Sequence, residues 1–134
     1  ISIVTERFED RSLWLNRKWT SEVLVNILEN AVKYTSPGGS ITIRVRATEM
    51  YTEIAVQDTG RSIRPEELTE IFKRFYRSRD VENLEGSGIG LYLSRLILER
   101  EKGYLTASSV PGEGSTFSVF LQNCQNLNQN LSGE

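Results

Sequence analysis

The stretch Glu22-Val-Leu-Val-Asn-Ile-Leu-Glu-Asn-Ala-Val-Lys-Tyr34 has apolar residues at the spacing of one helix face. Asn26, Asn30 and Lys33 follow one another at i, i+4 and i+7, so they line up on a second, polar face. Asn is a poor residue for a helix interior, and two of them in one helix call for a compensating reason. The stretch therefore predicts an amphipathic helix whose polar face is either solvated or binds a ligand.

Residues on both sides of this helix predict a sheet. Thr20 or Ser21 is expected to cap the helix at its start, and the Ser36-Pro-Gly-Gly39 sequence ends it. A short strand is expected at residues 1–4 and a brief second one at residues 14–15. Alternating apolar residues predict one hairpin over 41–47 and 54–58, with its turn near residues 49–50, and another over 104–108 and 116–121.

Asp58 lies in phase with Ile54 and Val56 and should point to the core side of the sheet where its strand ends. A buried carboxylate is costly unless it has hydrogen-bond donors. Two interpretations remain open from this residue alone. Asp58 either caps its own loop or accepts a hydrogen bond from an amine, such as the exocyclic amine of adenine.

Two further helices are expected. One starts at Pro65 and buries Leu68, Ile71, Phe72 and Phe75, and the other runs from Leu91 to Arg100. Between them, residues 76–85 lack periodicity and are rich in charge, which predicts a loop that can move.

The glycine-rich sequence Gly86-Ser-Gly-Ile-Gly90 enters the last predicted helix. Such an entry exposes backbone N–H groups at the positive end of the helix dipole, which suits phosphate. A flexible loop before a buried helix is the alternative. The sequence matches neither a Walker A motif nor a Rossmann fingerprint, so a different phosphate-binding architecture is required.

Composition limits the possible functions. The chain has 134 residues, 16 Lys and Arg against 18 Asp and Glu, no His and one Cys. The length predicts one domain, over residues 1–121, and the seven Asn and Gln among residues 122–134 predict a polar, disordered tail there. The lack of His excludes an imidazole base and any zinc site with a His ligand, and the single Cys excludes an internal disulfide. A formal charge of −2 gives no broad footprint for nucleic acid or for an anionic membrane.

The order of these motifs resembles the catalytic and ATP-binding domain of bacterial sensor histidine kinases, in the ATPase superfamily of gyrase, Hsp90 and MutL. Residues 26–35 resemble its N box, Asp58-Thr-Gly60 its first glycine box, and residues 72–77 its F box. Residues 86–91 and 112–117 are similar to the second and third glycine boxes. The five motifs cover most of the chain between residues 18 and 121.

The resemblance implies a Bergerat-type fold, an α+β two-layer sandwich with a mixed β-sheet covered on one face by about three helices. It implies that Asn30 ligates Mg²⁺, that Asn26 lies beside the phosphates of ATP, and that Lys33 and Arg77 contact them. Asn26, Lys33 and Arg77 are thereby the implied catalytic residues. The implied nucleotide contacts also include Tyr34, Asp58, Gly60, Ile63, Gly86, Gly88, Gly90, Leu91 and Thr116.

Two residues depart from the family pattern. Ser62 stands where the first glycine box usually has its second glycine, and Asn16 stands where many relatives have Asp. If the site requires a positive φ, Ser62 should be strained by about 1–2 kcal/mol. Asn16 should chiefly affect local hydrogen bonds.

The implied function is that of the nucleotide-binding half of a two-component sensor kinase. Because the chain has no His, the phosphoryl acceptor is expected on a separate dimerisation domain, with a response regulator as the next acceptor. The chain is expected to be a cytoplasmic part of a longer, membrane-anchored sensor protein, with no nucleic acid partner and no membrane contact of its own. Two alternatives stay open, a serine kinase of the anti-sigma type and a nucleotide-binding scaffold with degenerate catalysis.

Overall fold

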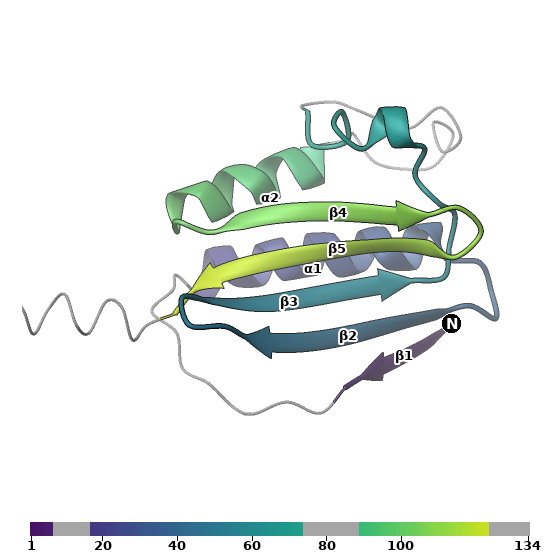
Figure 1. Ribbon diagram of the computed structural model, residues 1–134, viewed down its shortest axis with the longest axis horizontal. Helices are drawn as coiled ribbons and strands as arrows, with labels where there is room; N and C mark the ends of the chain where they lie inside the picture. Colours follow the sequence, from purple (N-terminus) through teal and green to yellow (C-terminus); the bar gives the residue numbers. More distant parts are fainter. Residues whose placement is uncertain (7–16, 74–88, 124–134) are drawn as a thin grey trace, which may run out of the picture.

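A computed structural model describes residues 1–6, 17–73 and 89–123, which form a five-stranded mixed sheet with helices on one face (Figure 1). The strands stand in the order β1-β2-β3-β5-β4. β1 pairs in parallel with β2, and all other neighbours are antiparallel. Their bounds are Ser2–Thr5 for β1, Ser40–Ala47 for β2, Tyr51–Asp58 for β3, Tyr104–Val110 for β4 and Gly114–Gln122 for β5.

Two α-helices, α1 (Arg17–Tyr34) and α2 (Ile89–Arg100), lie against the same face of the sheet (Figure 1). The core lies between the two layers, where Val23 and Ile27 of α1 pack with Val56, Val119 and other alternate residues of the strands. The α+β two-layer architecture expected from the sequence is confirmed. Among the described ranges, no helix is both long and apolar enough to cross a membrane.

The first helix begins earlier than predicted. α1 starts at Arg17, so Thr20 and Ser21 lie inside it and neither is a cap. Thr20 is buried, and its hydroxyl has no hydrogen-bond partner among the described residues. Thr20 continues the buried stripe of Val23 and Ile27 by one turn, and this tertiary packing outweighs the local preference of Thr for a cap.

The helix expected from Pro65 is only a single turn of 3₁₀-helix, η1 (Pro65–Glu67), and turns continue to Lys73. Arg64 holds Glu67 at 3.1 Å, and Leu68 and Lys73 close short turns through i→i+3 hydrogen bonds. The burial that the apolar pattern predicts is nevertheless present at two positions. Ile71 and Phe72 both pack on the core. Phe75 lies outside the described residues, as does the strand expected at residues 14–15.

Both predicted hairpins are present, with longer strands than expected. Thr48 and Tyr51 close the β2–β3 turn around residues 49–50. β5 runs to Gln122, and Asn123 is buried and binds the β2–β3 turn. The folded part therefore includes two residues that the sequence assigned to the tail, and residues 124–134 lie outside the described ranges.

Candidate nucleotide-binding site

Asp58 ends β3 on the helix side of the sheet and is 4% exposed. Its Oδ1 accepts hydrogen bonds from the backbone N–H groups of Gly60, at 2.9 Å, and Ser115, at 3.4 Å. Its Oδ2 has no hydrogen-bond partner within the described part of the chain. The buried position predicted from the alternation of β3 is thus present. One oxygen is held by the backbone and the other is available to a donor.

Burial raises the pKa of Asp58 above its ordinary value, and the N–H groups of Gly60 and Ser115 offset only part of this effect. No cation contributes to the balance within the described part of the chain. The carboxyl group therefore has fewer hydrogen-bond donors than its burial requires, and an amine of a ligand can add the missing donor.

Gly60 is required by the packing of the chain itself. A β-carbon on Gly60 would overlap the carbonyl oxygen of Tyr34, the last residue of α1. The N–H of Arg61 donates to the same carbonyl at 3.4 Å. The loop after Asp58 is therefore fixed against the end of α1, and the polar face of α1 lies beside it.

The polar face of α1 meets the start of α2. The side-chain amide of Asn26 donates to the hydroxyl of Ser94, a fully buried residue of α2, at 3.3 Å. Among the described residues, a β-carbon on Gly90 would meet only the side-chain carbon Cγ of Asn26, at 3.9 Å. Asn30 is half-buried one turn further along α1, so it stands with Asn26 on one face. The Asn26 amide therefore lies beside the first turn of α2, where backbone N–H groups suit an anion, and Asn30 follows it on the same face of α1.

Lys33 and Tyr34 are the last two residues of α1, and Leu91 lies in the first turn of α2. Lys33 is exposed, and its Nζ lies 5.9 Å from the centre of the Tyr34 ring. Tyr34 and Leu91 are half-buried, and Leu91 packs on the core. Lys33 thus adds an exposed cation to the two amides on the polar face of α1.

Thr116 is not brought together with Asp58. It pairs with Gln57 across β3 and β5, and Gln57 alternates with Asp58, so both point to the opposite face of the sheet. Ser115 is the residue of β5 beside Asp58, and the sequence analysis missed it. Ser115 alternates in phase with the apolar residues Phe117 and Val119, and this strand pattern is the signal that could have identified it.

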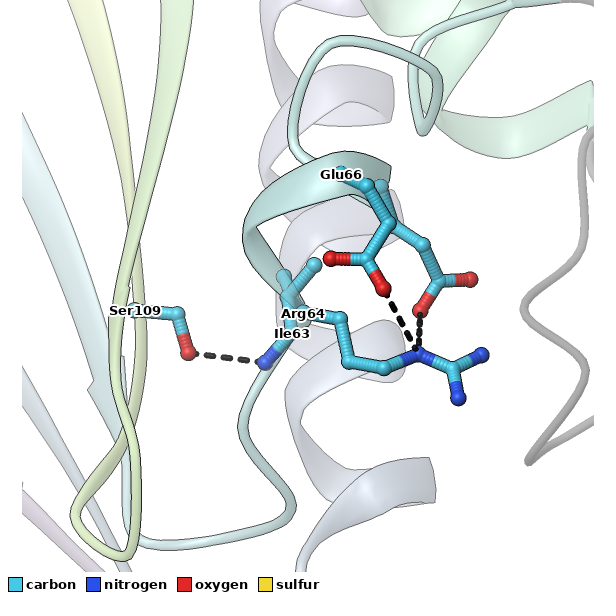
Figure 2. A network of polar contacts seen from close by, with 5 residues as sticks. Ile63, Arg64, Glu66 and Ser109 are labelled. Carbon is cyan, nitrogen blue, oxygen red and sulfur yellow. Dashed lines mark hydrogen bonds and ion pairs between the residues drawn. The ribbon is translucent and has the colours of Figure 1, made fainter.

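Ile63 and Ser62 connect the loop after Asp58 to the β4–β5 hairpin. The N–H of Ile63 donates to the hydroxyl of Ser109 at 2.7 Å, and Arg64 pairs with Glu66 and Glu67 beside it (Figure 2). The hydroxyl of Ser62 donates to the carbonyl of Val110 at 2.7 Å and accepts from the N–H of Gly112 at 3.1 Å.

The strain expected at Ser62 is absent. Among the described residues, Lys102 is the only non-glycine residue with a positive φ. The backbone therefore passes Ser62 in a conformation open to any residue, and the side chain has contacts of its own. Arg77, Gly86, Gly88 and Asn16 lie outside the described ranges.

The profile of the family described as "Histidine kinase-, DNA gyrase B-, and HSP90-like ATPase" matches residues 16–125. The chain belongs to this family. Among curated members, it is 37% identical over 110 residues to the sensor histidine kinase RppB of Synechocystis, covering 81% of this chain and 24% of RppB. It is 44% identical over 102 residues to the phosphate regulon sensor protein PhoR of Pseudomonas aeruginosa, covering 75% of this chain and 23% of PhoR. The chain thus spans about a quarter of the length of these two relatives.

Solved structures of this ATPase family share the fold. The mycobacterial sensor histidine kinase MprB superposes with a TM-score of 0.78 at 23% identity, over 91% of this chain and 80% of that one. The catalytic domain of histidine kinase ThkA, in a nucleotide-free form, gives a TM-score of 0.77 at 24% identity, over 91% and 78%. These similarities concern the fold of the two-layer domain.

Proposed function

We propose that this chain is the ATP-binding catalytic domain of a two-component sensor histidine kinase. The observation that carries the proposal is the Asp58 carboxylate, which is buried, held by two backbone N–H groups through one oxygen, and without a partner among the described residues at the other. An exocyclic amine of adenine is the donor that fits a carboxylate in this position. The membership of the ATPase family and the names of the relatives support the same conclusion.

The residues of α1 fit the phosphate end of Mg-ATP. Within the described residues, no group of three or more His, Cys, Asp or Glu could hold a metal on its own. The amide oxygen of Asn30 suits a Mg²⁺ ion that already has phosphate oxygens and water as ligands. When bound, this ion neutralises charge on the phosphates. Asn26 and the exposed Lys33 stand on the same face and are placed to orient them.

The phosphoryl acceptor must come from elsewhere, because the sequence contains no His. We infer that a histidine on a dimerisation domain of the same protein or of its partner subunit receives the phosphoryl group, and that a response regulator receives it next. Positioning by Asn26, Asn30, Lys33 and Arg77 supplies the catalysis in this scheme, together with the glycine residues Gly86, Gly88 and Gly90. The domain would then act in the cytoplasm, as part of a membrane-anchored sensor.

The scaffold alternative loses its motivation. Degenerate nucleotide binding would follow from strain at Ser62, the departure from the first glycine box, but Ser62 has two hydrogen bonds and no positive φ. No described feature favours the serine kinase alternative.

A calorimetric titration with ADP, with and without Mg²⁺, tests the proposal. Asp58→Ala is expected to abolish binding, because adenine loses its acceptor. Asn30→Ala should remove the effect of Mg²⁺ on affinity. Glu53→Ala is the matched control, because Glu53 lies on β3 with Asp58 but alternates to the opposite face. Wild-type affinity in both site variants would refute the assignment of the site.

A further inference from the structure

We propose that Ser109, assisted by Ser62, is a positioning residue for recognition of the adenine base. The hydroxyl of Ser109 fixes both Ser115, which binds Asp58, and Ile63, which ends the loop after Asp58. This inference rests on the proposed function, because it concerns how the same site selects its base.

Ser109 is the junction of the β4–β5 hairpin and the loop. Its Oγ lies 2.7 Å from the N–H nitrogen of Ile63, 3.0 Å from the carbonyl oxygen of Gly114 and 3.2 Å from the Oγ of Ser115. Figure 2 shows the first of these contacts, which runs from β4 to the chain just before Arg64. A single hydroxyl therefore joins the end of the loop to both strands of the hairpin.

Ser115 carries the connection on to Asp58. Its N–H donates to Asp58 Oδ1 at 3.4 Å, and its hydroxyl donates to the carbonyl of Arg61 at 3.3 Å. The middle of the loop and the carboxylate are thus held by one residue, whose own hydroxyl is in contact with Ser109. This chain of contacts supports one of the two donors that orient Asp58, and the N–H of Gly60 is the other.

Replacement of Ser109 by an apolar residue leaves backbone groups of the loop and the hairpin without partners. The hydroxyls of Ser109 and Ser115 carry one hydrogen each, so at any moment they donate to two of three acceptors, namely Gly114 O, Arg61 O and the partner hydroxyl. Without Ser109, the Ile63 N–H loses its acceptor and Gly114 loses a donor. Half-buried backbone groups without partners favour a shift of the loop toward other partners.

Ser62 ties the same loop to the hairpin from its exposed side. It bridges Val110 O and Gly112 N across the β4–β5 turn. The two serines therefore hold consecutive residues of the loop, 62 and 63, to one hairpin. Asn30 and Lys33, on α1, have no part in these contacts, so loss of the serine contacts should affect binding of the base and not of the phosphates.

Parallel titrations with ADP and GDP test the proposal. These ligands share their phosphates and ribose, so the ratio of their dissociation constants reports on the base alone. Ser109→Ala should weaken ADP binding by about tenfold, which corresponds to about 1.4 kcal/mol, and leave GDP binding nearly unchanged. Ser109→Thr keeps the hydroxyl and should restore the ratio to within about threefold of wild type. Ser108→Ala is the matched control, because Ser108 is exposed on the opposite face of β4.

The outcomes distinguish a failure of the nucleotide site from a failure of the positioning role of Ser109. No ADP affinity in the folded wild-type chain would refute the nucleotide site itself. An equal loss for ADP and GDP in Ser109→Ala would show that Ser109 acts only on stability, and this overturns the positioning role. Should Ser109→Ala fail to fold, as judged by circular dichroism, Ser62→Ala decides the matter. A reduced preference for ADP in that variant supports the proposal, and an unchanged preference overturns it.

Discussion

The carbonyl oxygen of Tyr34 occupies the space that a β-carbon on Gly60 would need. The end of α1 and the loop after β3 therefore touch backbone to backbone. This contact sets the distance between the polar face of α1 and Asp58, two residues before Gly60. The spacing of the two halves of the candidate site is thus fixed by a residue that has no side chain.

Gly60→Ala should destabilise the fold. The added methyl group must push the loop and the end of α1 apart, and overpacking of this kind costs roughly 1–3 kcal/mol. Urea denaturation measures the change in the free energy of unfolding. Gly90→Ala, at the second residue of α2, is the control, because within the described part of the chain a β-carbon there meets one atom only, Asn26 Cγ at 3.9 Å. This variant should be neutral or stabilising. Equal stability of Gly60→Ala and wild type would contradict the close contact.

Asp58→Asn should stabilise the ligand-free chain at neutral pH. Because burial raises the pKa of Asp58 in the folded state, the folded chain binds more protons than the unfolded chain above pH 3.8. The free energy of unfolding of the wild type therefore falls as pH rises from there through the raised pKa. The amide side chain of the variant does not titrate, so the advantage of the variant should grow over the same window. Urea denaturation at several pH values measures it, and a constant difference would contradict the raised pKa.

Ser62→Gly should lower stability by about 1 kcal/mol, because it removes two hydrogen bonds to the β4–β5 turn without relieving strain. Ser62→Ala should give a similar loss, which separates the hydroxyl from the added backbone freedom of glycine. Thermal and urea unfolding both measure this. A glycine variant more stable than the wild type would show that the backbone at Ser62 is strained.

Asn123→Ala should cost roughly 2–3 kcal/mol, since its buried side chain accepts from Thr52 and donates to the carbonyls of Thr48 and Glu49. The neighbouring Gln122→Ala should change stability little, because the turn contacts come from Asn123 and Gln122 is only half-buried. A chain ended after Asn123 should likewise be more stable than one ended after Leu121. Equal stability of those two chains, measured by urea denaturation, would show that the folded domain ends at residue 121.

Local pattern was sufficient for much of the fold. The alternation of Ile54 and Val56 placed Asp58 on the core side of its strand, and helical spacing aligned Asn26 with Asn30. The turn between β2 and β3 followed from the change of pattern near Glu49. In each case the information lies within a few residues of the element that it predicts.

Distant contacts account for what the sequence analysis missed. Ser62 bonds to residues 48 and 50 positions away, and Asp58 meets Ser115 across 57 positions, so no local pattern shows either pair. Thr20 joins the helix because it is buried against the core, which overrides its capping preference. Thr116, an implied nucleotide contact, lies on the face of β5 opposite to Asp58, and strand alternation rather than the motif shows this.

The strand order also bears on when the domain can fold during synthesis. β5 lies between β3 and β4, yet it is the last described element of the chain. While residues 114–122 are still inside the ribosome, β3 has an open edge and Asp58 lacks Ser115. The sheet is therefore completed, and Ser115 reaches Asp58, only after the translating ribosome has released β5.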